Sequence, residues 1–142
     1  MKYVRMVLGV LVGLYALMGV YNFGVGAAVK AGAMALPDAM GKYGPLIEAM
    51  AWWHIAVLLV AMVVYLVAAY RLLRGGKAFP AYALAVGIDI AIWLYGKTLP
   101  VYDQVFTAAD RQMEYAVIGL LVASLALVWW TEREPTASAA AA

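Results

Sequence analysis

Asp89 is the residue whose position in this sequence most strongly indicates chemistry. It interrupts an otherwise apolar run between Ala85 and Trp93. At a rise of about 1.5 Å per residue, it lies more than about 10 Å from either end of its predicted helix, near the centre of a membrane. A carboxylate at that depth costs at least about 2.5–3.5 kcal/mol to insert, so we expect it to face the bundle interior or a wet cavity.

The sequence leaves two interpretations of Asp89 open. In the first, its carboxyl group belongs to a ligand-binding or proton-carrying site, which is the usual meaning of an ionisable group inside a membrane. Burial would favour the protonated acid, which can donate a hydrogen bond or carry a proton. In the second, Asp89 is a neutral aspartic acid with a structural role, bonded to a neighbouring helix.

His54 is the only histidine of the chain. We expect it about one turn inside the outer end of the second helix, at nearly the depth of Asp89. A His–Asp pair across the second and third helices could relay protons or bind a polar ligand, because histidine titrates near neutral pH. The alternative is an interfacial histidine beside Trp52 and Trp53, with its polar edge among the lipid headgroups.

Every predicted helix offers one polar residue in its outer half, and together these residues predict a polar pocket that opens outward. Pockets between the helices of a bundle are common ligand sites. Two members have simpler explanations: Glu114 has Arg111 three residues earlier as a local partner, and Asn22 can hydrogen-bond another helix. The residues predicted to form this ligand or proton pocket are Asp89, His54, Asn22, Glu114, Tyr95 and Trp93.

Composition identifies the solvent that surrounds these residues. Of 142 residues, 68% are hydrophobic and 13% are charged, whereas a soluble domain is near half apolar and a quarter charged. A domain of this size cannot bury so much apolar surface away from water. The lipid bilayer is therefore the expected partner, and most soluble enzymes, nucleic-acid binders and disordered chains are excluded. The net charge of +2 likewise gives no indication of nucleic-acid binding.

Four apolar stretches approach the roughly 20 residues that a spanning helix needs, and none alternates as a barrel strand would. We predict an all-α integral membrane protein, a bundle of four transmembrane helices. Glycines and Pro80 separate the second helix from the third, and the segment from Thr107 to Asp110 resembles a capping box that starts the fourth. A disordered cytoplasmic tail is expected over residues 132–142. The predicted helices cover residues 6–29, 50–70, 80–96 and 108–130.

The basic residues predict the orientation. Six lie on one predicted side and four on the other, and the compact group from Arg71 to Lys77 is typical of a cytoplasmic loop. Both termini are then cytoplasmic, in an inner (plasma) membrane. A cleaved signal peptide is the alternative for the first stretch, but that stretch is long for such a peptide.

Several chemistries are excluded by residue counts. Without cysteine there is no disulfide, thiolate nucleophile, iron–sulfur cluster or thiolate-bound zinc, and a single histidine excludes a haem held by two histidines of one chain. We therefore expect no metal and no cofactor. An enzyme is the class favoured least, because no nucleophile triad or metal cluster is evident.

Two functional hypotheses follow. The first is a small membrane protein that binds or moves a small molecule or a proton through the pocket centred on Asp89. The second is a non-catalytic accessory or interaction subunit of a larger membrane complex, with a membrane immunity or stress protein as a variant of it. Gly9 and Gly13 form a G-x-x-x-G pattern that predicts close helix packing, either within the bundle or in a homo-oligomer.

Overall fold

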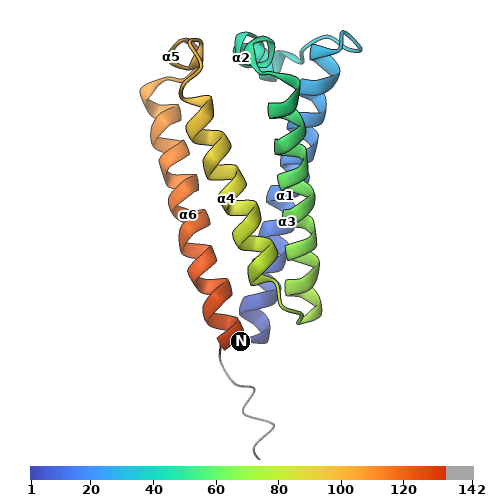
Figure 1. The fold of residues 1–142 in the computed structure, drawn as a ribbon, viewed down its shortest axis with the longest axis vertical. Coiled ribbons are helices and arrows are strands. Elements are labelled where there is room, and N and C mark those ends of the chain that lie inside the picture. Colours follow the sequence, from blue (N-terminus) through green and yellow to red (C-terminus); the bar gives the residue numbers. More distant parts are fainter. Residues whose placement is uncertain (134–142) are drawn as a thin grey trace, which may run out of the picture.

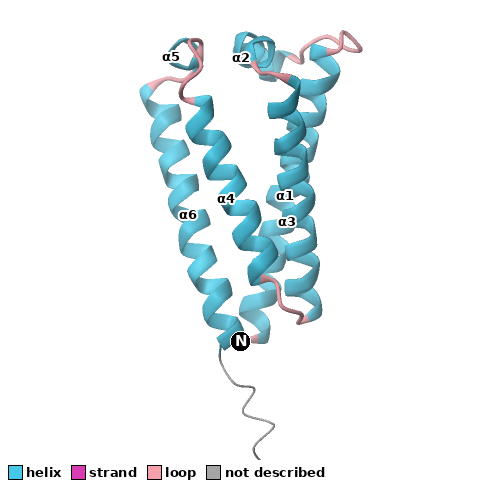
Figure 2. Ribbon diagram, in the orientation of Figure 1, coloured by secondary structure: helices cyan, strands magenta, loops and turns pink. Residues whose placement is uncertain are grey.

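The structure, a computed structural model, describes residues 1–133. Over that range the chain is helical apart from short connections, and it contains no β-strand (Figure 2). Three short elements are η1 (Asp38–Tyr43), α2 (Gly44–Ala49) and α5 (Tyr102–Val105). The predicted all-helical fold with four candidate spans is confirmed, while insertion and orientation stay predictions. The four helices long and apolar enough to cross a membrane are α1 (Lys2–Lys30), α3 (Trp52–Arg74), α4 (Phe79–Gly96) and α6 (Ala108–Arg133).

The long helices run up and down, and α1 packs along α3 while α4 lies between α3 and α6 (Figure 1). The N-terminus, the α3–α4 connection and the end of α6 lie together at one end, which we call the N-terminal end. The short helices α2 and α5 lie at the opposite end, the α2–α5 end. Figure 1 shows the pair α1 and α3 diverging from the pair α4 and α6 toward the α2–α5 end.

Close packing of α1 on α3 uses the predicted glycine pattern. A Cβ atom on Gly9 would lie 2.8 Å from Leu73 Cγ and 3.2 Å from the carbonyl oxygen of Ala69. A Cβ atom on Gly13 would lie 3.7 Å from Ala69 Cβ, which is ordinary contact. The two glycines therefore face α3 of the same chain, so the packing seen is within the bundle.

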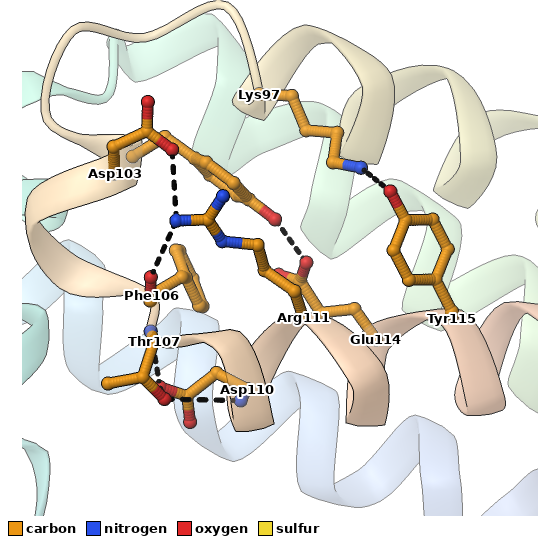
Figure 3. A network of polar contacts seen from close by, with 9 residues as sticks. Lys97, Asp103, Phe106, Thr107, Asp110, Arg111, Glu114 and Tyr115 are labelled. Carbon is orange, nitrogen blue, oxygen red and sulfur yellow. Dashed lines mark hydrogen bonds and ion pairs between the residues drawn. The ribbon is translucent and has the colours of Figure 1, made fainter.

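The helix boundaries have local causes. The helix α3 continues to Arg74, beyond its predicted end at residue 70. Gly75, whose φ of 77° suits glycine, follows it, and the N–H of Gly76 donates to the carbonyl of Arg71 at 2.8 Å. At the start of α6, the N–H and hydroxyl of Thr107 donate to Asp110 Oδ2 at 2.9 and 2.8 Å (Figure 3). The N–H of Asp110 donates back to Thr107 Oγ1 at 3.3 Å, which completes the predicted capping box.

The start of α4 is capped by a residue from another helix. Pro80 lies in its first turn, as predicted, while the N–H groups of Ala78 and Phe79 donate to Glu132 Oε1 at 2.5 and 3.0 Å. A carboxylate at a helix N-terminus satisfies free N–H groups and complements the helix dipole. Because α6 continues through Arg133, residues 132–133 are helical, contrary to the predicted disordered tail. The rest of that prediction, residues 134–142, lies outside the described residues.

Substituting Glu132→Ala is expected to lower the free energy of unfolding by about 1 kcal/mol, the usual effect of losing a helix cap. The loss arises because two N–H groups of α4 would lose their acceptor. Denaturation in detergent by increasing SDS would measure it. Glu48→Ala is the matched control, since the Glu48 side chain is exposed. Equal stability of the two variants would show that the cap contributes nothing.

Candidate functional site

Asp89 lies on α4 and faces the bundle interior. Its Oδ2 accepts a hydrogen bond from the hydroxyl of Tyr15 on α1 at 2.6 Å and another from Tyr65 on α3 at 3.2 Å. Three helices therefore meet at one carboxyl group. Two phenol donors compensate in part for the loss of water around that group.

The two tyrosines belong to a larger group, the tyrosine cluster, formed by Tyr15, Tyr65 and Tyr82. The Tyr65 side chain is fully buried, and its ring makes edge contacts with those of Tyr15 and Tyr82 at centroid distances of 5.3 and 5.7 Å. The hydroxyl of Tyr82 lies 2.5 Å from Ser124 Oγ on α6. Sequence reasoning missed this cluster, although a tyrosine in the middle of an apolar helix is a usable signal, because its hydroxyl needs a partner in lipid.

A pocket of about 230 Å³ extends from Asp89 toward the α2–α5 end, and we call it the Asp89 pocket. All four long helices contribute to it, together with α2, α5 and their flanking residues. It brings together four of the six predicted site residues: Asp89, His54, Trp93 and Glu114. The other lining residues are Phe23, Leu46, Met50, Leu58, Ile92, Gly96, Tyr102 and Phe106.

The other two predicted residues lie at the periphery. Asn22 lines a neighbouring pocket of about 430 Å³ between α1, η1 and α2, and the two pockets share several lining residues, Phe23 among them. Tyr95 does not line the Asp89 pocket. Its ring packs instead against Trp53 and His54, at centroid distances of 4.9 and 5.2 Å.

His54 has a buried polar atom without a partner. The side chain is 4% exposed, which places it inside the protein rather than among lipid headgroups. Its Nδ1 finds no hydrogen-bond partner among residues 1–133, and neither does Nε1 of Trp93. The direct His54–Asp89 hydrogen bond considered from the sequence is not formed between these residues. An unpaired buried polar group costs about 1–3 kcal/mol, which is avoided when water or a ligand supplies the partner.

Glu114 does not pair with Arg111 as the sequence suggested. Its Oε2 accepts a hydrogen bond from the hydroxyl of Tyr102 on α5, while Arg111 contacts Asp103 at 3.2 Å and the carbonyl of Phe106 at 3.3 Å (Figure 3). Because α5 lies over the start of α6, Tyr102 of α5 is the partner of Glu114 in place of Arg111. Burial and the neighbouring Glu114 carboxylate raise the pKa of Tyr102, so its phenol stays protonated and donates.

The cations near the pocket have partners of their own. Lys97 Nζ lies 4.2 and 4.4 Å from the ring centroids of Trp93 and Tyr115, and it donates to the Tyr115 hydroxyl at 2.7 Å (Figure 3). Lys42 on η1 pairs with Asp110 on α6 at 2.8 Å, and this hydrogen bond raises the pKa of Lys42. The Lys42–Asp110 pair links the α1 side of the bundle to the α6 side at the α2–α5 end.

A third hollow borders the tyrosine cluster. It measures about 690 Å³, lies between α1 and α6, and is lined by the three tyrosines, Ser124 and aliphatic side chains. Tyr15 and Tyr65, which line this groove, donate hydrogen bonds to Asp89, which lines the Asp89 pocket. Asp89 is thus hydrogen-bonded to two phenols, and Tyr82 to the hydroxyl of Ser124, and such groups can exchange protons.

Comparison with known proteins finds no family model that matches the chain, and no significantly similar curated protein or solved structure.

Proposed function

We propose that this protein binds or moves a small molecule or a proton through the Asp89 pocket. The observation that carries the proposal is the convergence of three titratable side chains, His54, Asp89 and Glu114, from three different helices on one pocket. A pocket that combines apolar walls with a few converging polar groups is the usual form of a ligand site. The unpartnered Nδ1 of the buried His54 supports a bound water or ligand at this place.

The tyrosine cluster supports a role in proton movement. The hydroxyl groups of Tyr15 and Tyr65 donate to Asp89, and the Tyr65 ring contacts that of Tyr82, whose hydroxyl lies beside Ser124. A proton that enters the Asp89 pocket would therefore find exchangeable groups on both sides of the carboxyl group. In this proposal Asp89 is the central carrier, and the phenols hold its carboxyl group in place.

We further propose an inner (plasma) membrane location with both termini cytoplasmic. Arg71, Arg74 and Lys77 lie at the short α3–α4 connection, at the N-terminal end, and such clusters are retained on the cytoplasmic side. The Asp89 pocket, which extends toward the α2–α5 end, would then open outward.

The full chain reconstituted in liposomes with a trapped pH-sensitive dye tests the function. Under an imposed pH gradient we expect proton flux that Asp89→Asn abolishes and His54→Ala reduces. Asp38→Asn is the matched control, because Asp38 is exposed on η1. Flux that both pocket variants leave unchanged would contradict the proposal. A wild-type protein that shows no proton flux and binds none of phenylethylammonium, 2-phenylethanol and phenylacetate would contradict it as well.

The alternative, a non-catalytic accessory or interaction subunit of a larger complex, is favoured by one observation. Over its 26 residues, α6 buries only Leu121, Val128 and Thr131 within the described chain. Most of its surface is left to lipid or to another protein. Co-purification of a reproducible larger partner after mild solubilisation would support this alternative, and a stable lone protein would oppose it.

A further inference from the structure

Each of the two carboxyl groups in the Asp89 pocket has a free oxygen. In Asp89, Oδ2 takes both tyrosine hydrogen bonds, and in Glu114, Oε2 takes that of Tyr102. No residue within 1–133 donates a hydrogen bond to the second oxygen of either group. The pocket therefore offers two carboxyl oxygens that are free to accept a hydrogen bond, one on α4 and one on α6.

No positive charge of the described chain enters the pocket to balance them. Its lining residues include the acidic Asp89 and Glu114 and the imidazole of His54, but no lysine or arginine side chain. Lys97 is held by Tyr115 and by the ring of Trp93, and Arg111 by Asp103 and a carbonyl. Because unpaired buried charge is costly, an ionised pocket needs a counter-charge from outside the chain.

Aromatic rings supply part of the remaining walls. Phe23, Trp93, Tyr102 and Phe106 all line the pocket, and aromatic faces attract cations. The ring of Trp93 already has the ammonium group of Lys97 4.2 Å from its centroid. The neighbouring pocket of about 430 Å³ shares Phe23 and Phe106, so an apolar group could extend into it from a cation held at the carboxylates.

We infer that the Asp89 pocket takes a small organic cation, an amine that carries an apolar group. This inference rests on the proposed function and names its ligand class. The ammonium group lies between the free oxygens of Asp89 and Glu114, and the apolar group lies on the aromatic walls. The unpartnered Nδ1 of His54, in a side chain only 4% exposed, accepts an N–H of the same ligand.

Three probes of nearly equal shape test the ligand class: phenylethylammonium, 2-phenylethanol and phenylacetate. Binding of each to the full chain in lipid nanodiscs would be measured by calorimetry, with empty nanodiscs to subtract partition into lipid. We expect the cation to bind more tightly than the other two. Asp89→Asn and Glu114→Gln should each weaken its binding about tenfold or more, the scale of one charge-assisted hydrogen bond. Glu48→Gln, at an exposed glutamate, should leave it unchanged.

The outcomes separate this inference from the proposed function. If the alcohol or the carboxylate binds as tightly as the cation, and this binding depends on Asp89, the assignment of a cationic ligand is wrong. The pocket would still be a ligand site. Cation binding that neither variant weakens would overturn the inference, as would binding of none of the three. Among the described side chains, only Tyr102 forms a hydrogen bond with Glu114, so Glu114→Gln remains informative if Asp89→Asn fails to fold.

Discussion

Replacement of Tyr65 by alanine is expected to lower the free energy of unfolding by about 3–5 kcal/mol, the range for truncating a large buried aromatic side chain. Tyr65 is fully buried, and its ring contacts two other tyrosines. Its hydroxyl also donates to Asp89. The substitution would leave a cavity where α1, α3 and α4 meet, and would remove one of the two donors to the carboxyl group.

Unfolding by SDS in mixed micelles would measure this loss. Tyr70→Ala is the matched control on the same helix, because Tyr70 is 60% exposed, and its loss should stay below about 1 kcal/mol. Tyr65→Phe removes only the hydroxyl and should cost about 1 kcal/mol. If Tyr65→Ala were no more destabilising than Tyr70→Ala, the tyrosine cluster would not hold the helices together.

Substituting Gly9→Val is expected to destabilise the bundle by about 1–3 kcal/mol, the cost of overpacking a close interface. The new side chain would meet Leu73 and, at 3.2 Å, the carbonyl oxygen of Ala69, which cannot move without its helix. The same change at Gly24, where a Cβ atom has nothing within 4 Å, is the control on the same helix.

Unfolding in detergent would compare the two glycine variants, and size-exclusion chromatography would report their oligomeric state. Equal stability would show that α1 does not depend on Gly9 to approach α3. A changed oligomeric state with unchanged stability would mean that the glycine face acts between copies of the chain instead.

Much of the fold could be predicted because its causes are local. Gly75 ends α3, Pro80 lies in the first turn of α4, and the Thr107–Asp110 box starts α6, each through contacts with residues nearby in the chain. The Glu132 cap could not be predicted in this way. It joins α6 to the start of α4 across 53 and 54 residues, and nothing near Glu132 in sequence indicates that contact.

The candidate site was predictable only in part. Asp89 and His54 stand out because each is polar within an apolar run, and both line one pocket. Tyr15 and Tyr65 resemble the many other aromatic residues of the chain until their hydroxyls are seen on Asp89. Tyr95 was expected in the pocket because of its depth, but depth does not tell which way a side chain points.

The sequence by itself determined that the chain forms four apolar helices, approximately where they end, and which polar residues interrupt the apolar stretches. It could do so because length, composition and capping act over a few residues. Only the tertiary structure decided which helix faces meet. A membrane helix is apolar toward lipid as well as toward its neighbours, so no hydrophobic stripe marks its inner face. The contact of Tyr15 with Asp89, 74 residues apart, therefore comes from packing alone.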